Sequence, residues 1–266
     1  MIKAGLVSIS FRDLPVAAVA AAAAEAGLRS VEWGGDVHVP HGDLKAAAAA
    51  KAVCADLGLE TAAYGSYYRA GESPAQGLEF GTVLETAVAL GAPTIRVWAG
   101  ALGSAVADAA YRDLVAADLR RAADMASAAG VDVGVEYHGG TLTDDDSSAR
   151  ALLRKVGNLA AYWQPPVGMS PEMRKRSLAA VLGRLANLHV FHWRGTERLP
   201  LAEGRGEWVE YLRMAAADGR GRHALLEFAK DDSPGQMAAD AKVLLGILEE
   251  VEIIPTKMRT GLQKSV

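Results

Sequence analysis

The sequence of 266 residues contains a single cysteine, Cys54. One cysteine cannot build an intrachain disulfide framework or a cysteine-rich zinc site, and we interpret Cys54 as a small buried helix residue. Aromatic residues are also few, at 6%, whereas hydrophobic residues make up 50% of the chain. This hydrophobic content supports a sizeable core and excludes a globally disordered chain.

The sequence also lacks a basic excess and a long apolar run. Its 28 Lys and Arg residues face 32 Asp and Glu residues, so little is available to neutralise a phosphate backbone and we expect no nucleic-acid partner. The most apolar early run, from Val16 to Ala24, ends at Glu25 and is far shorter than the roughly 20 residues of a membrane span. The N-terminus lacks the ordered regions of a signal peptide. We therefore expect no membrane partner and a cytoplasmic protein.

Short β-favouring segments alternate with longer alanine-rich segments of helical spacing, at a period of about 30 residues. Several expected helices end in a glycine that can close a helix in the left-handed conformation: Gly27, Gly58, Gly91 and Gly130. The expected strands cover residues 2–8, 28–33, 60–65, 93–98, 131–137, 159–164, 187–193 and 223–228. The expected helices cover residues 15–26, 43–57, 74–90, 105–129, 146–156, 170–184, 207–218 and 234–250.

Eight β/α units in about 250 residues are typical of a (β/α)8 TIM barrel of the α/β class. A doubly wound open sheet is the main alternative, but five or six strands would suit it better. No dinucleotide fingerprint and no phosphate-binding P-loop follows any expected strand. Because no linker or composition break interrupts the pattern, the sequence predicts one barrel domain over residues 1–254 and a polar, basic C-terminal tail over residues 255–266.

Side chains at the carboxyl ends of barrel strands converge on one mouth, where active sites of this fold lie. On four consecutive strands, these ends carry Glu136, Gln164, His189 and Glu227. Two carboxylates buried close together repel each other unless one takes a proton or a cation lies between them. Such oxygen and nitrogen ligands suit Mn²⁺, Co²⁺, Zn²⁺ or Mg²⁺. His192 follows His189 by three positions, so on a regular strand only one of the two faces the barrel axis.

Further residues near the expected mouth are candidates for substrate binding: His138, His192, Trp33, Tyr64, Trp98, Arg96 and Lys230. The aromatic side chains can form apolar walls for the C–H face of a sugar, or can simply pack in the core or rim. Arg96 and Lys230 can bind a carboxylate or phosphate of a substrate, or serve as structural ion-pair partners. His138 can donate to a substrate oxygen, or form a hydrogen bond within its own turn.

With these residues in this order around the barrel, the sequence resembles the xylose isomerase-like TIM barrels, a superfamily of sugar isomerases and epimerases, inosose dehydratases and endonuclease IV. The resemblance extends over about residues 1–250 and is carried by the segments at 31–36, 136–140, 188–192 and 226–228. It implies a divalent metal held by Glu136, Gln164, His189 and Glu227. The superfamily has an Asp where this chain has Gln164 and an acid where it has His192, which implies a site with fewer negative charges.

The resemblance further implies that a sugar, sugar phosphate or related polyol binds with its carbonyl on the metal. Glu136 and Glu227 are the catalytic candidates: one takes the α-proton, and the other returns it to the opposite face (epimerisation) or to the neighbouring carbon (isomerisation). Two alternatives stay open, a metal-dependent dehydratase of a keto-polyol and a non-catalytic sugar-binding barrel or subunit, the second of which Gln164 favours. A homo-oligomer is also an open alternative. Six histidines and an acidic net charge argue against a nuclease with a multi-zinc cluster.

Overall fold

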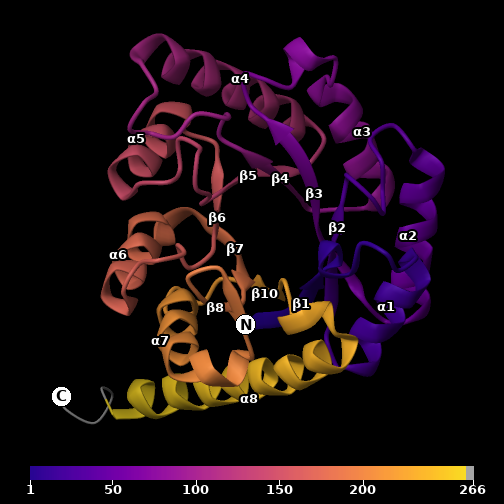
Figure 1. The fold of residues 1–266 in the computed structure, drawn as a ribbon, viewed down its shortest axis with the longest axis vertical. Coiled ribbons are helices and arrows are strands. Elements are labelled where there is room, and N and C mark those ends of the chain that lie inside the picture. The colour runs from indigo at the N-terminus through magenta and orange to yellow at the C-terminus, as the bar shows by residue number, and fades with distance from the viewer. Residues whose placement is uncertain (262–266) are drawn as a thin grey trace.

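In the computed structural model, eight parallel strands close into a barrel that helices surround (Figure 1). The structure describes the backbone of residues 1–261 and the side chains of residues 1–252. The barrel strands are β1 (Ile2–Val7), β2 (Ser30–Gly34), β3 (Glu60–Arg69), β4 (Thr94–Trp98), β5 (Asp132–Glu136), β6 (Ala160–Trp163), β7 (Leu185–Val190) and β10 (Arg222–Leu226). Their order around the barrel is β1-β10-β7-β6-β5-β4-β3-β2. The predicted TIM barrel is therefore confirmed.

One long helix follows each barrel strand and packs its apolar face on the outside of the barrel (Figure 1). The helices are α1 (Val16–Glu25), α2 (Leu44–Asp56), α3 (Phe80–Leu90), α4 (Ala109–Ala128), α5 (Asp146–Val156), α6 (Pro171–Val181), α7 (Arg205–Ala216) and α8 (Pro234–Gly261). Side-chain caps start several of them, such as Asp43, whose Oδ1 accepts from the backbone N–H of Ala46 at 2.9 Å. The glycines expected to close helices all have positive φ.

Two apolar layers flank the barrel wall. The larger one lies between the strands and the helices, and includes Trp33, Tyr64 and Trp163. A smaller cluster inside the barrel includes Val7, Ala62, Tyr162 and Leu225. Because successive side chains of a strand point to opposite faces, each strand contributes to both layers. A residue's place in this alternation therefore decides whether it faces the barrel interior or the helices.

The sequence predicts one strand over residues 187–193, but β7 ends at Val190. The chain then forms a small antiparallel hairpin of β8 (His192–Arg194) and β9 (Glu197–Leu199), with Gly195 at φ 56° in its turn. Trp208 Nε1 of α7 donates a hydrogen bond to the carbonyl of Phe191 at 2.9 Å, so this carbonyl needs no hydrogen-bond partner on a neighbouring strand. The strand thus stops before it reaches His192.

At the C-terminal end, α8 continues past the helix end expected at residue 250 and past the domain boundary expected at residue 254. Residues 262–266 of the expected tail lie outside the described residues. Among residues 1–261, no helix has both the length and the apolar character needed to cross a bilayer.

Candidate active site

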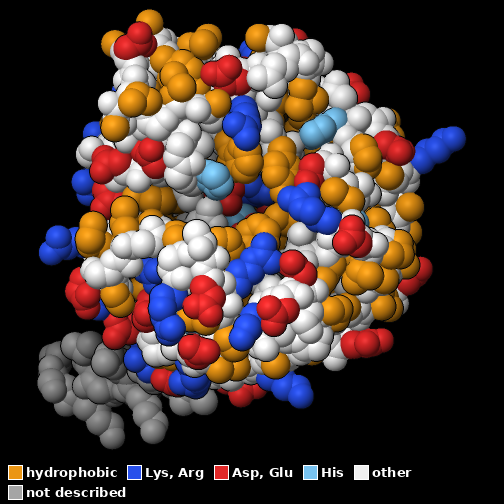
Figure 2. Space-filling view, viewed as in Figure 1, with side chains coloured by type: hydrophobic (Ala, Val, Ile, Leu, Met, Phe, Trp, Pro, Cys, Tyr) orange, Lys and Arg blue, Asp and Glu red, His pale blue; other side chains and the backbone are white. Residues whose placement is uncertain are grey.

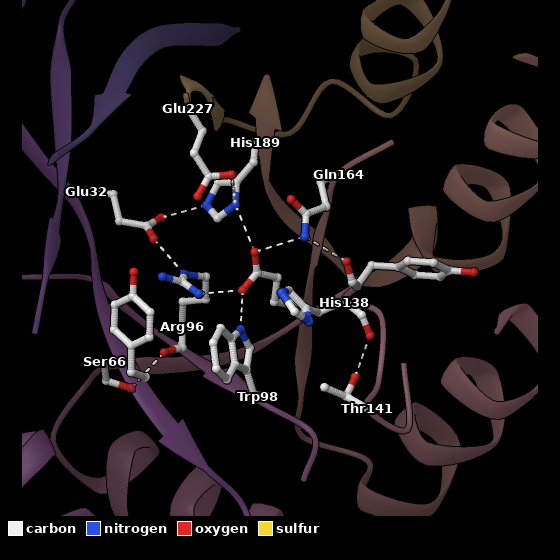
Figure 3. A network of polar contacts seen from close by, with 12 residues as sticks. Glu32, Ser66, Arg96, Trp98, His138, Thr141, Gln164, His189 and Glu227 are labelled. Atoms are coloured by element: carbon white, nitrogen blue, oxygen red, sulfur yellow. Dashed lines mark hydrogen bonds and ion pairs between the residues drawn. The ribbon is translucent and has the colours of Figure 1, made fainter. Parts of the chain in front are cut away.

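Five buried charged or titratable side chains meet inside the barrel near the carboxyl ends of its strands (Figure 3). Glu32 comes from β2, Arg96 from β4, Glu136 from β5 and His189 from β7, and Glu227 follows β10 directly. All five occupy inward positions in the alternation of their strands. The strands therefore bring together groups that are far apart in the sequence.

His189 lies at the centre of this network. Its Nδ1 is 3.1 Å from Glu136 Oε1 and 3.5 Å from Glu227 Oε2. Ligand atoms of Glu136, His189 and Glu227 all lie within 4.8 Å of one another, so the three residues can hold one metal ion. Oxygen and nitrogen donors of this kind suit several divalent metals, including Mg²⁺, Mn²⁺ and Zn²⁺.

Gln164, which follows β6, is half-buried at the edge of the network. Its Nε2 donates to Glu136 Oε1 and to the carbonyl of Tyr137, both at 3.1 Å. The amide group thus points its donor at the carboxylate, and its oxygen, the atom able to bind a cation, takes no part in these two contacts. The structure brings Gln164 together with the three possible ligands, as the sequence predicts.

Arg96 joins two of the buried carboxylates. Its Nε donates to Glu32 Oε1 at 2.7 Å, and its Nη1 donates to Glu136 Oε2. With only 2% of its surface exposed, the guanidinium is held inside the barrel by these ion pairs. From the sequence, Arg96 is a candidate for a substrate contact or a structural ion pair, and in the structure its Nε and Nη1 donate to protein carboxylates.

The charges of the network do not balance by themselves. Three carboxylates face one guanidinium, which leaves a net charge of −2 when His189 is neutral. Oε2 of Glu227 is buried and accepts no hydrogen bond from the described residues. A buried carboxylate oxygen without a partner is costly unless a proton or a cation satisfies it. Both observations fit a divalent cation at this position.

Without a cation, bound protons reduce the net negative charge of the network. Burial of Glu227, together with the nearby charge of Glu136, raises the pKa of Glu227 to about 7. Burial disfavours the imidazolium of His189, but Glu227 and Glu32 outweigh it and raise the pKa of His189 to about 10. Burial likewise opposes ionisation of Glu136, yet Arg96 and His189 hold its pKa below the usual range.

Aromatic side chains line the mouth above the network. Trp98 Nε1 donates to Glu136 Oε2, and the Trp98 ring lies 4.8 Å from the ring of His138. Tyr67 lies across from them, with the Arg96 guanidinium 5.2 Å from its ring centre and Trp98 at 5.3 Å. Figure 2 shows a hollow at the centre of this face, with histidine, basic and apolar side chains around it.

A cavity of about 400 Å³ adjoins this mouth between the segment after β1 and the segment after β10. Phe228, the neighbour of Glu227, lines it on one side, and Arg12, which donates to the Tyr67 hydroxyl at 3.0 Å, lines it on the other. Arg198 also lines the cavity and pairs with Asp232, whereas Arg12 pairs with Asp36. The cavity therefore offers both donors and acceptors next to apolar surface.

Two predicted wall residues do not reach the mouth. Trp33 follows the inward Glu32 on β2, so strand alternation turns its ring toward the helices, where it lies 5.9 Å from the ring of His38. Tyr64 precedes Gly65, packs in the same outer layer and donates to the carbonyl of Val39 at 2.8 Å. Both rings are fully buried core residues in this structure.

The last two predicted contacts form none of the hydrogen bonds or ion pairs that link the described side chains of the network. His192 begins β8, beyond the end of the barrel strand, and its ring lies against Gly204, where a Cβ would come within 2.4 Å of Nδ1. His189, and not His192, therefore faces the barrel axis. Lys230 lies in the short 3-10 turn Lys230–Asp232, three residues beyond Glu227.

Glu32 and Tyr67 also lie at the site, although neither is among the site residues predicted from the sequence. Glu32 had a usable signal, because a charged residue between Val31 and Trp33 on a buried strand needs a partner. Tyr67 had none: β3 continues to Arg69, past its expected end at residue 65, and its pairing with β4 shifts register between Gly65 and Arg69. Tyr67 takes φ 55° within this irregular stretch.

Gly65 leaves the space that the Arg96–Glu32 ion pair occupies. A Cβ at this position would come within 2.8 Å of Arg96 Nη2 and 2.9 Å of Glu32 Oε1. We expect Gly65→Ala to lower the free energy of unfolding by about 1–3 kcal/mol, because this tightly packed charged pair would have to move. Urea unfolding at neutral pH measures the loss. Gly183→Ala is the control, since a Cβ there meets no atom within 4 Å; equal stability of the two variants would show that the pair is not tightly confined.

Comparisons with known proteins agree with the barrel fold of the structure. The pattern that defines a family described as "Xylose isomerase-like TIM barrel" matches residues 20–247. Among curated proteins, the search by sequence finds no match. Similar solved structures include a probable 3-DHS dehydratase, AsbF, involved in petrobactin synthesis from Bacillus anthracis. It is 19% identical with a TM-score of 0.75, and the match covers 92% of this chain and 99% of that one.

Two further structures of similar size match over nearly their full length. An L-ribulose 3-epimerase is 17% identical with a TM-score of 0.70, covering 100% of this chain and 99% of the other. A xylose isomerase-like TIM barrel protein from Mycobacterium smegmatis, in complex with magnesium, is 18% identical with a TM-score of 0.72, covering 94% and 98%. At these identities, the similarity establishes a shared fold.

Proposed function

Because the chain belongs to the xylose isomerase-like TIM barrel family, we propose that it is a divalent-metal-dependent isomerase or epimerase of a sugar or related polyol. The observation that carries this proposal is the buried group of Glu136, His189 and Glu227, whose ligand atoms lie within 4.8 Å of one another. Sugar epimerases among the similar structures support the reaction class.

The donor set fits a divalent cation despite Gln164. An Asp at position 164 would make the net charge of the network −3, whereas the amide keeps it at −2 beside one guanidinium and a neutral imidazole. A charge of −2 matches that of the cation, so Gln164 does not argue against metal binding on electrostatic grounds. Glu136, His189 and Glu227 would hold the ion, and the amide oxygen of Gln164 is a fourth possible ligand.

A bound divalent cation would polarise a substrate carbonyl and lower the energy of the charge that develops when the adjacent carbon loses its proton. Around it, Arg96 and Trp98 hold one oxygen of Glu136 in place. Oε2 of Glu227 has no such partner among the described residues and is the freer group to take or return a proton. Trp98, Tyr67 and His138 would enclose the substrate on the opposite side.

The second candidate is a dehydratase that uses the same centre to expel a β-hydroxyl group. The similar structure described as a probable 3-DHS dehydratase favours it. Mass spectrometry of the products separates the two reactions, because isomerisation and epimerisation conserve the substrate mass whereas dehydration removes one water. The cavity with paired Arg12 and Arg198 supports hydroxyl-bearing substrates in either case.

Metal binding tests the proposal directly. We expect the protein, purified without chelator, to contain about one divalent ion per chain, and we expect Mn²⁺ at 100 times its Kd to stabilise the metal-free protein by about 2.7 kcal/mol. Thermal unfolding with and without Mn²⁺, after removal of metal by EDTA, measures this shift. A protein that contains no metal and whose unfolding temperature does not respond to Mn²⁺, Mg²⁺, Co²⁺ or Zn²⁺ would contradict the proposal.

A further inference from the structure

Glu32 is the third buried acid of the network, but it lies on the far side of His189 from Glu136 and Glu227. We infer that Glu32 is a positioning residue, which holds the proton of His189 on Nε2 so that Nδ1 presents its lone pair to the metal. The inference rests on the proposed function, which supplies the divalent ion that His189 would bind. It assigns to β2 a part in a site whose possible ligands come from the opposite half of the barrel.

The two nitrogens of His189 have different surroundings. Nδ1 lies 3.1 Å from Glu136 Oε1 and 3.5 Å from Glu227 Oε2, and these are the two acids of the possible metal centre. Nε2 lies 3.2 Å from Glu32 Oε2. A neutral imidazole carries one N–H, and a metal binds the other nitrogen. An ion among Glu136, His189 and Glu227 therefore requires Nδ1 to be the ligand, which leaves the N–H to point at Glu32.

Glu32 is itself fixed, which a positioning role requires. It has no exposed surface, and its second oxygen, Oε1, accepts from Arg96 Nε at 2.7 Å. Arg96 also donates to Glu136, so one guanidinium spans the carboxylate behind His189 and a carboxylate in front of it. Tyr162 packs against the imidazole with ring centres 5.6 Å apart. The ring of His189 is thus confined on its Nε2 side and on one flank.

A purely structural ion pair would also bury Glu32 beside Arg96. The two roles differ in what they do to His189. A structural pair needs only charge complementarity with Arg96, whereas a positioning residue also determines which nitrogen of His189 carries the proton. Carboxylate or carbonyl partners of metal-bound histidines typically change metal affinity by about 10–100-fold when they are removed.

The experiment uses the full chain labelled with 15N-histidine, with Zn²⁺ as a diamagnetic probe and His189 assigned from the signals lost in His189→Asn. In the unsubstituted protein, we expect Zn²⁺ to shift Nδ1 and to leave a slowly exchanging proton on Nε2. Glu32→Gln, whose amide oxygen still accepts a hydrogen bond, should keep that proton. Glu32→Met should lose it and should bind Zn²⁺ about 10–100-fold more weakly. Glu60→Gln, a change at an exposed acid, is the control.

Each outcome separates this inference from the proposed function. If Glu32→Met keeps both the Nε2 proton and the Zn²⁺ affinity, or if Zn²⁺ shifts Nε2 instead of Nδ1, the positioning role is wrong while metal binding stands. If the unsubstituted protein binds no metal but loses the Nε2 proton in Glu32→Met, the proposed function fails and the orientation of His189 by Glu32 stands. Should Glu32→Met not fold, Glu32→Met combined with Arg96→Met removes both members of the pair and serves the same comparison.

Discussion

Glu227→Gln should abolish turnover, reducing kcat by about 10²–10⁴-fold or more, because it removes both a possible metal ligand and the carboxylate freest to move a proton. The same change should not weaken the metal-free fold. A buried carboxylate without a hydrogen-bond partner is unfavourable, and a neutral amide of the same shape avoids that cost. We therefore expect an equal or higher unfolding temperature in EDTA and a smaller stabilisation by Mn²⁺. Steady-state kinetics and thermal unfolding measure the two effects.

Glu210→Gln provides the matched control for this prediction. Glu210, on α7, is an exposed acid that pairs with Lys175 of α6 in the outer layer of helices. We expect it to leave both kcat and the response to Mn²⁺ unchanged. Full activity of Glu227→Gln would reject the two-glutamate mechanism, and a Mn²⁺ response equal to that of the unsubstituted protein would remove Glu227 from the ligand set.

Arg96→Met should be the most destabilising single change in the barrel interior, costing about 3–5 kcal/mol. The guanidinium is the partner of both Glu32 and Glu136, and its loss leaves two buried carboxylates with only His189 to offset their charge. Urea unfolding in the presence of EDTA measures the loss without a contribution from metal. Exposed ion pairs, such as Lys3–Glu60, should contribute less than about 1 kcal/mol by the same measurement.

A double substitution tests whether Arg96→Met destabilises the protein through unpaired buried charge or through altered packing. Combining Arg96→Met with Glu32→Met replaces the pair with apolar side chains of similar size, and such replacements are often neutral or stabilising. We expect the double variant to regain part of the stability that Arg96→Met loses, since Glu32 no longer needs a partner whereas Glu136 still lacks its guanidinium. A double variant as unstable as Arg96→Met would indicate that the unpaired charge of Glu32 does not cause the loss.

The fold follows from local signals that the sequence carries openly. Apolar runs at strands, glycines at several helix ends and polar residues at several helix starts recur along the chain, and each is set by short-range physical chemistry. Their repetition eight times determines the barrel, since that number of units closes the sheet. The hairpin of β8 and β9 carried no such signal, because it depends on Trp208 binding the carbonyl of Phe191 from a helix that comes later in the chain.

The site was harder to predict because side-chain direction depends on register. Glu136, Gln164, His189 and Glu227 come together as their strand-end positions predict, although their roles stay a proposal. Trp98 lies at the mouth as predicted, but the other two wall residues differ by one position: the inward residue is Glu32 and not Trp33 at β2, and Gly65 and not Tyr64 at β3. A shift of one position reverses the face of every side chain on a strand. Because the sequence locates strand ends only to within a few residues, it does not determine which of two successive side chains faces the barrel interior.

The closure of the barrel by β1 and β10 also determines when the site can form. Ile2 to Leu6 pair with Arg222 to Leu226, so β1 cannot complete its pairing until β10, which comes much later in the sequence, is in place. Until then, Glu32 and Arg96 have neither His189 nor Glu227 beside them, and the half-built sheet keeps two open edges. The charged interior is thus complete only when the barrel closes, and a chain truncated before residue 222 would leave β1 and β7 as open edges and expose Glu32 and Glu136, which the finished barrel encloses.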